Sequence, residues 1–222
     1  MKPSLKKWLD SLAIKGFPDE FEAKRLLNLY KIATPKACRL HPDDNLGRLE
    51  FNPPFVLKVC SGNILHKTEQ DGVMLNLDNE SLPKAVAHFR ARFPNSALLI
   101  EEQVAFKGVE FIIGALVDPD FGPAVMAGAG GILTEIYKDV VFRLAPCPPE
   151  EALRMLQELI VAPVLKDFRG IHIDARELAG IISKTSDLVF ELGSSVCQLD
   201  INPLVFSRSS WIALDAKLVL NG

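Results

Sequence analysis

Two apolar runs near the carboxyl end most constrain how this chain can fold. Residues 199–206 and 211–218 are rich in branched side chains and flank a short polar segment, which predicts antiparallel strands joined by a turn. Each run carries an oxygen-bearing side chain where a hydrophobe would be expected. Asp200 and Asn202 are two positions apart, so they share one face of the first strand, and Asp215 can face them from the second.

These side chains predict a pocket for a hard cation. Mg²⁺ takes oxygen ligands, and the protein usually supplies one or two of them while water and substrate phosphates fill the other positions. The alternative is that Asn202-Pro203 only forms a turn and that Asp215 is a solvated strand residue. The two strands alone leave both interpretations open.

Composition narrows the class of protein. The chain has 222 residues, of which 48% are hydrophobic and 24% charged, enough for one large domain or two small subdomains. Its net charge of -3 argues against nonspecific nucleic-acid binding, which needs a basic face. Because no apolar run reaches membrane-spanning length and the amino terminus lacks a signal-peptide core, we expect a cytoplasmic protein without a membrane partner.

Two cationic residues stand within apolar strands. Lys58 lies in the run 55–60, and burying a lysine there is costly unless it meets an anion, so it is a candidate phosphate ligand. The alternative is a lysine that extends to solvent from an edge strand. Arg143 lies in the run 140–145, where its planar guanidinium suits phosphate and a structural ion pair is the alternative.

The remaining pattern alternates helices and strands. Apolar residues at helical spacing predict helices near residues 5–12, 23–30, 82–93, 153–160 and 178–189. The run 97–104 is expected to pair with 109–117, and carboxylates in these strands could bind an exocyclic amine and sugar hydroxyls or simply be solvated. The glycine-rich segment 128–131 lacks a Walker lysine, and such segments often serve only close backbone packing. His66 lies in a turn-rich segment, and this context by itself favours a surface histidine over a reactive one.

Seven ordered motifs together resemble a known family. The chain is similar, from about Phe21 to Leu220, to the beta subunit of ADP-forming acetyl-CoA synthetase, in the nucleotide-diphosphate-forming acyl-CoA synthetase group, which has an ATP-grasp fold. The motifs that carry the resemblance are Val56–Val59, Ile64–Thr68, Gly108–Glu110, Asp118–Pro123, Gly128–Ile132, Lys138–Pro146 and Asp200–Leu204.

The resemblance implies an α+β fold in which two α+β subdomains hold MgATP between them. On this basis we expect an N-terminal docking helix in residues 1–20, ATP-grasp subdomain 1 in 21–96 and ATP-grasp subdomain 2 in 97–222. The cofactors implied are ATP or ADP and Mg²⁺.

The resemblance also assigns roles by position. His66 would relay the phosphoryl group, Arg143 would neutralise phosphate charge, and Asp200 would support the metal ligands without binding the ion. Glu135 is left as a supporting or metal-binding group. The other implied contacts are Lys58 to phosphate, Glu101, Glu102, Gln103 and Val104 around the adenine, Glu110 to the ribose, and Asn202 and Asp215 to Mg²⁺.

The implied activity is that of an acid-CoA ligase: acyl-CoA, ADP and phosphate interconvert with free acid, CoA and ATP. The partner would be an alpha subunit that carries the CoA-binding and phosphohistidine domains, so we expect a hetero-oligomer. A non-catalytic nucleotide-binding regulatory or assembly subunit is the alternative. Three features depart from the family: Glu101 replaces an expected glutamine, residues 171–174 differ, and the segment from Thr34 to Phe55 is short.

Overall fold

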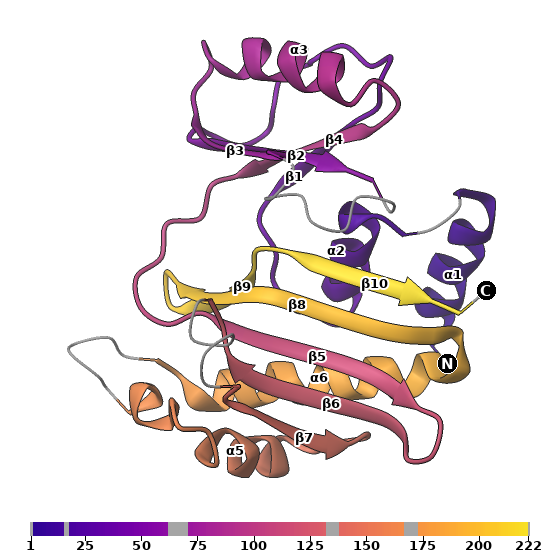
Figure 1. Ribbon diagram of the computed structural model, residues 1–222, viewed down its shortest axis with the longest axis vertical. Coiled ribbons are helices and arrows are strands. Elements are labelled where there is room, and N and C mark those ends of the chain that lie inside the picture. The colour runs from indigo at the N-terminus through magenta and orange to yellow at the C-terminus, as the bar shows by residue number, and fades with distance from the viewer. Residues whose placement is uncertain (1, 16–17, 62–70, 132–137, 167–172, 222) are drawn as a thin grey trace. The chain divides into compact units, whose positions relative to one another are not determined.

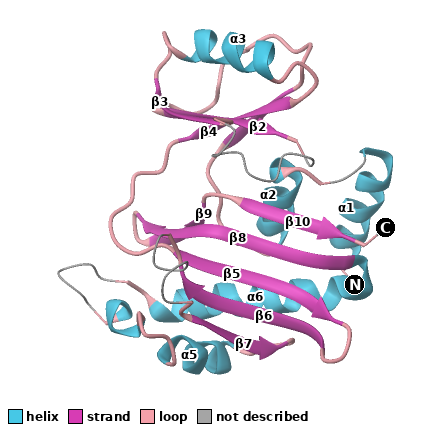
Figure 2. Cartoon of the chain, in the orientation of Figure 1, coloured by secondary structure: helices cyan, strands magenta, loops and turns pink. Residues whose placement is uncertain are grey.

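The protein is described here by a computed structural model covering residues 2–15, 18–61, 71–131, 138–166 and 173–221. Its internal contacts divide the chain into two compact units. Unit 1 comprises Met1–Pro18, Ala23–Thr34 and Phe106–Gly222, and unit 2 comprises Asp19–Glu22 and Pro35–Ala105. Each unit combines a sheet with helices (Figure 2), so the predicted α+β class is confirmed.

Unit 2 is built on a four-stranded antiparallel sheet with the order β1-β4-β2-β3. One helix, α3, lies along one face of it (Figure 1). Leu82, Ala85, Val86 and Phe89 form the apolar stripe of this helix and are buried in the core beneath it. The bounds are β1 Ala37–Leu40, β2 Phe55–Cys60, β3 Val73–Leu77, α3 Leu82–Arg92 and β4 Ala97–Glu102.

Unit 1 is built on a six-stranded sheet with the order β10-β8-β5-β6-β7, and β9 also pairs with β8. Helices α5 and α6 cover one face of this sheet (Figure 1). The strands are β5 Phe111–Asp118, β6 Gly122–Ala129, β7 Val140–Leu144, β8 Val196–Ser207, β9 Ser210–Ala213 and β10 Ala216–Leu220. The helical segments are α5 Pro149–Gln157, η1 Ala162–Leu165, α6 Ala175–Leu192 and η2 Gly193–Ser195.

The ends of α6 follow from its sequence. The Asp174 carboxylate accepts hydrogen bonds from the backbone amides of Arg176 and Glu177, which satisfies donors that the first helical turn leaves free. Gly193 follows the last turn with a φ of 51°, a conformation that glycine adopts without steric cost. Between these ends, the apolar stripe packs on the sheet.

The two amino-terminal helices also contribute to the large core. These are α1, Pro3–Lys15, and α2, Glu20–Leu29. Leu5, Trp8 and Leu12 of α1 are buried in the same apolar cluster as the inner face of the six-stranded sheet. The predicted helix is therefore present, and it packs as part of unit 1.

The expected pairing of 97–104 with 109–117 is wrong. Strand β4 has β1 on one edge and β2 on the other, so it has no free edge for β5. Strand β5 instead pairs with β6 and β8. For the same reason unit 2 extends to Ala105, whereas the sequence placed the subdomain boundary between residues 96 and 97.

The carboxyl-terminal strands differ from expectation in one detail. The predicted turn is present between β8 and β9, but the run 211–218 is not one continuous strand. It breaks at Leu214 and Asp215, after which β10 pairs with an earlier part of β8. This break places Asp215 outside regular strand geometry.

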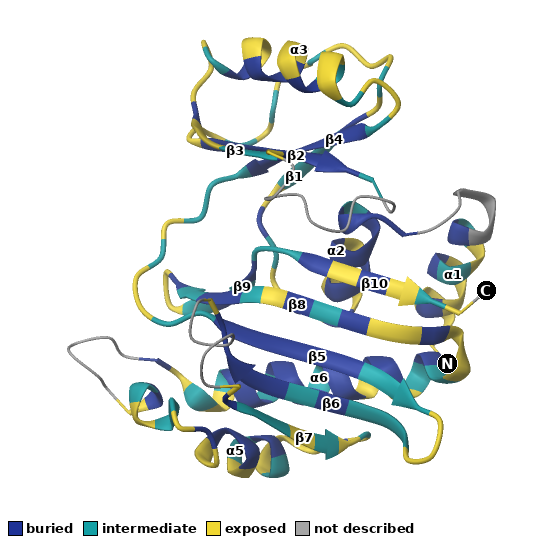
Figure 3. Cartoon of the chain, in the orientation of Figure 1, coloured by how far each residue is buried: buried dark blue, intermediate teal, exposed yellow. Residues whose placement is uncertain are grey.

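Burial follows the two sheets (Figure 3). In β8, Leu199 and Ile201 are buried, whereas Gln198 and Asn202 are exposed and Asp200 is half-buried. This alternation confirms that one face of the strand meets the core and the other carries polar side chains. In the described part of the chain, no helix combines the length and apolarity needed to cross a membrane.

Candidate functional site

The predicted metal-binding side chains come from facing segments of unit 1. The backbone amide of Asn202 donates a 3.2 Å hydrogen bond to the carbonyl of Asp215, and that of Leu214 donates a 2.9 Å bond to the carbonyl of Pro203. These two bonds hold the segment between β9 and β10 opposite Asn202. This confirms that Asp215 faces the Asn202 segment, while metal binding itself stays a prediction.

The electrostatics around these residues fit a cation. Burial raises the pKa of Asp200, and the nearby Asp215 carboxylate raises it further, while Lys217 acts in the opposite direction. A cation beside the two carboxylates would relieve their repulsion. No group of three His, Cys, Asp or Glu side chains suited to a metal ion occurs among the described residues. The oxygen-bearing side chains of Asn202 and Asp215 are of the kind that Mg²⁺ takes when water and phosphate fill its other positions.

A buried lysine that the sequence did not single out supports the Asp215 segment. Lys24, on α2, is only 3% exposed, and its ammonium donates a 2.7 Å hydrogen bond to the carbonyl of Leu214. Its position four residues after Glu20, on a helix with a buried face, is the signal that could have marked it. Lys24 thus fixes the residue directly before Asp215.

Lys58 lies in a central strand, so the alternative of a lysine extending from an edge strand is wrong. Its ammonium is 2.7 Å from Glu20 and 2.9 Å from Glu101, and all three side chains are buried. The expectation that Lys58 meets an anion is met by carboxylates of the chain itself. A phosphate contact stays a prediction, and Glu20 is a partner that sequence reasoning missed.

The predicted adenine segment lies at the end of β4. Glu101 is the last buried residue of this strand, and the amide of Glu102 donates a 2.9 Å hydrogen bond to the carbonyl of Lys36. The amide of Gln103 donates a 2.9 Å bond to the carbonyl of Pro54. The backbone that leads to Val104 is therefore held by the neighbouring chain before it leaves the sheet.

Glu110, the predicted ribose ligand, is packed against the glycine segment 128–131. The amide of Gly130 donates a 2.6 Å hydrogen bond to the Glu110 carbonyl. A methyl group on Gly130 would lie 2.9 Å from the backbone of Glu110, closer than carbon atoms approach. Gly131, with a φ of 68°, lies beside the Glu110 carboxylate. The glycines therefore permit close backbone packing at Glu110, which is the packing role that the sequence suggested for the segment 128–131.

Arg143 lies on β7 and is engaged by α5. Its Nε donates a 2.7 Å hydrogen bond to Glu151, and its guanidinium also pairs with Glu158. Hydrogen bonds from Arg143 and Arg154 lower the pKa of the Glu151 carboxyl. This is the structural ion pair that the sequence left open, so the phosphate role of Arg143 stays a prediction.

Two predicted residues lie outside the described part of the chain. These are His66, the predicted phosphoryl relay, and Glu135, the possible supporting or metal-binding group.

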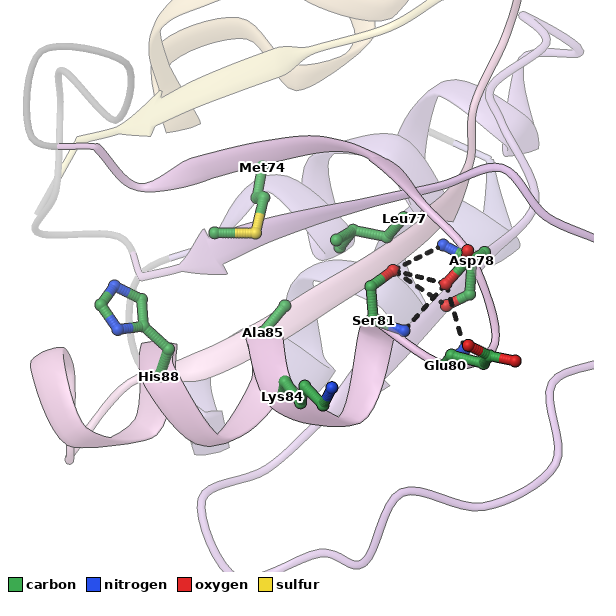
Figure 4. Close-up of a pocket in the computed structure, with 8 residues that line it drawn as sticks. All are labelled: Met74, Leu77, Asp78, Glu80, Ser81, Lys84, Ala85 and His88. Atoms are coloured by element: carbon green, nitrogen blue, oxygen red, sulfur yellow. Dashed lines mark hydrogen bonds between the residues drawn. The ribbon is translucent and has the colours of Figure 1, made fainter.

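An open pocket of about 460 Å³ lies in unit 2 between β3 and α3 (Figure 4). Met74 and Leu77 line it from the strand, and Lys84 and His88 from the helix. At its rim, the Asp78 carboxylate accepts hydrogen bonds from the amide and hydroxyl of Ser81, 2.8 and 2.7 Å long, which form the turn into α3. None of the residues lining this pocket belongs to the predicted nucleotide or metal set.

Two units, each built on an antiparallel sheet with helices, set the fold class of this protein. A protein-family description, ATP-grasp domain, matches residues 15–220. The chain belongs to this family, within the group that contains the beta subunits of ADP-forming acetate-CoA ligases. The resemblance drawn from the motifs is thereby confirmed.

Individual relatives support this placement. The chain is 38% identical to acetate-CoA ligase (ADP-forming) I subunit beta of Pyrococcus furiosus, covering 90% of each chain. It is 30% identical to 4-hydroxybutyrate-CoA ligase (ADP-forming) of Nitrosopumilus maritimus, covering 92% of this chain and 31% of that one. A solved acetyl-CoA synthetase 1 of Ca. Korarchaeum cryptofilum, with coenzyme A and Mg-AMPPCP, has a TM-score of 0.80 at 29% identity, covering 97% of this chain and 99% of that one. Its phosphohistidine segment points towards the nucleotide-binding site.

Proposed function

We propose that the chain is the nucleotide-binding beta subunit of an ADP-forming acid-CoA ligase and that it exchanges phosphoryl groups between ATP and an alpha partner. The observation that carries this proposal is the placement of Asp215 opposite Asn202, in a chain of this family. Acetate is the default acid, because two relatives that the chain covers to 90% and 91% of their length are acetate-CoA ligases.

In this proposal the described residues bind and orient the nucleotide. The backbone of 102–104 receives the adenine, Glu110 the ribose hydroxyls, and Lys58 the phosphate charge. Asn202 and Asp215 hold Mg²⁺, which when bound neutralises charge on the phosphate oxygens. Positioning and charge neutralisation are the main contributions a protein makes to phosphoryl transfer.

His66 is proposed to carry the phosphoryl group. A lone pair of its neutral imidazole attacks the terminal phosphorus of ATP, a nitrogen-phosphorus bond forms, and the bond to the ADP oxygen breaks. The phosphoryl group then passes to the phosphohistidine segment of the alpha partner, and His66 is regenerated. Two transfers of moderate difficulty thereby replace one transfer between distant sites.

The need for a partner rests on the longer relatives. In the Methanocaldococcus jannaschii acetate-CoA ligase, the matching segment covers only 30% of the protein. The remaining functions of such a ligase would therefore come to this chain from a separate alpha subunit.

Labelled ATP tests the proposal. We expect the chain, incubated with MgATP labelled on the terminal phosphate, to acquire an acid-labile, base-stable label that His66→Ala abolishes. His88→Ala, which alters a histidine of the pocket in unit 2, is the matched control and should label like the parent. MgATP binding without any label would favour the non-catalytic alternative, and no MgATP binding by calorimetry would reject both.

A further inference from the structure

Strand β3 contains a bulge at Asn76. Phe55 of β2 is opposite Leu77, but Leu57 is opposite Met74, so β3 has one residue more than β2 across this interval. Asn76 has a φ of 58°, in the left-handed region that asparagine tolerates better than most residues. The bulge turns the Asn76 amide away from regular pairing.

The side chain of Gln103 closes on this bulge through two reciprocal hydrogen bonds. The Asn76 amide donates to Gln103 Oε1 at 2.6 Å, and Gln103 Nε2 donates to Asn76 Oδ1 at 2.8 Å. Strand β2 lies between β3 and β4, so the two residues do not come from paired strands. Gln103 therefore reaches past the start of β2 to meet Asn76.

The consequence is a fixed backbone directly after β4. The Gln103 amide donates to the Pro54 carbonyl at 2.9 Å, so the main chain and the side chain of this residue are both anchored within unit 2. Asn76 is exposed and Gln103 half-buried, and the two hydrogen bonds lie at the surface, where such a bond contributes little to stability. The bulge and its left-handed residue therefore serve the conformation of Gln103 more than the stability of the sheet.

We propose that Asn76 and Gln103 are positioning residues that hold the backbone of 102–104 in the geometry that reads an adenine base. The inference rests on the proposed function, because it assigns the base to this backbone. Adenine is read there through its exocyclic amine, which donates to a carbonyl, and its ring nitrogen, which accepts from an amide. The amides of Glu102 and Gln103 already donate to Lys36 and Pro54, so the amide that the ring nitrogen accepts from is that of Val104.

Three variants separate positioning from folding. Gln103→Ala removes both side-chain hydrogen bonds and leaves the bulge residue in place. Asn76→Gly keeps the amide donor and suits the positive φ, so it loses only the bond from Gln103 Nε2. Asn76→Asp keeps an acceptor at that position and serves as the rescue variant. Gln157→Ala, an exposed glutamine at the end of α5, is the matched control.

The measurement is the dissociation constant of the full chain for MgATP and for MgITP by calorimetry, with thermal unfolding in parallel. ITP carries hypoxanthine, which lacks the exocyclic amine, so the ratio of the two constants reports base recognition. We expect Gln103→Ala to weaken MgATP binding roughly five- to tenfold and to shrink the ITP-to-ATP ratio. Asn76→Gly should show a smaller change of the same kind, and Asn76→Asp and Gln157→Ala should match the parent.

If Gln103→Ala and Asn76→Gly leave the ratio of the two dissociation constants unchanged, the inference is overturned, whether or not binding of both nucleotides weakens. A parent chain that binds MgATP but does not distinguish it from MgITP would overturn it as well, while leaving the proposed function intact. If the parent chain binds neither nucleotide, the proposed function itself is rejected. The phosphoryl-label experiment tests that function independently.

Discussion

A buried lysine needs a counterion, and at Lys58 the chain supplies two. Glu20 and Glu101 approach its ammonium from α2 and β4, and all three groups are withdrawn from solvent. Such a cluster is costly to break, because removing one member leaves charges buried without compensation. Lys58 is therefore a structural residue of unit 2 whatever it does with phosphate.

Replacing Lys58 by methionine should destabilise the chain by about 3 kcal/mol, because the two carboxylates would be left facing each other. Chemical denaturation measures this change. Lys84→Met, on the exposed face of α3, is the matched control and should change stability by less than about 0.5 kcal/mol. The double variant Glu20→Gln with Lys58→Met should recover part of the loss, and equal stability of the two lysine variants would contradict this account.

For Asp215 we expect a loss of nucleotide binding rather than a loss of stability. We expect Asp215→Asn to weaken MgATP binding more than tenfold while unfolding stays close to that of the parent, since a metal site loses charge and the segment keeps its shape. Calorimetry and thermal unfolding on the same samples test this. Asp120→Asn, in the exposed turn between β5 and β6, is the control. Equal binding by mutant and parent would remove Asp215 from the metal site.

Among the elements, the end of β6 shows how close packing fixes Glu110, the proposed ribose ligand. Gly130 contacts the Glu110 backbone where no side chain fits. Gly130→Ala should therefore displace Glu110, cost about 1 to 3 kcal/mol and weaken nucleotide binding. Gly180→Ala, in α6 where an added Cβ would meet no atom within 4 Å, should instead stabilise the chain by about 0.5 to 1 kcal/mol. Denaturation and calorimetry on both variants test the pair, and a harmless Gly130→Ala would count against the role of this contact.

The contact between β7 and α5 has a pH signature. Arg143 and Arg154 hold the pKa of Glu151 below its ordinary value, so the ionised carboxylate stabilises the fold above that ordinary value. This contribution should fade as the pH falls through the lowered pKa. In Arg143→Gln, we expect the stability deficit relative to the parent to be largest near neutral pH and to shrink in acid, as followed by denaturation at several pH values.

Arg48→Gln, at an exposed position in unit 2, controls for the loss of one positive charge and should show no such trend. A deficit in Arg143→Gln that is independent of pH would assign the effect to packing rather than to the ion pair.

At the scale of the whole molecule, the proposed function makes the chain dependent on a partner. The purified chain should bind MgATP yet form no acyl-CoA from acid, ATP and CoA, because the CoA-binding domain is proposed to reside on the alpha subunit. Adding that subunit should restore acyl-CoA formation, which a coupled assay for ADP measures. Asp215→Asn with the same partner is the negative control. Acyl-CoA formation by the chain alone would contradict the proposed division of labour.

Most helices, most strands and the placement of Asp215 opposite Asn202 could be predicted from the pattern of the sequence. These features depend on local periodicity and on a short turn, which neighbouring residues specify. The ordered motifs also identified the family, since they recur along nearly the whole chain.

Which strands pair and which buried charges meet depends on the tertiary structure. It placed β4 between β1 and β2 rather than beside β5, and it brought Glu20 to Lys58 and Gln103 to Asn76. Those contacts join residues that lie tens of positions apart, and a strand's periodicity does not specify its neighbours. A lysine in an apolar run predicts that an anion lies nearby, but the fold determines which anion it is.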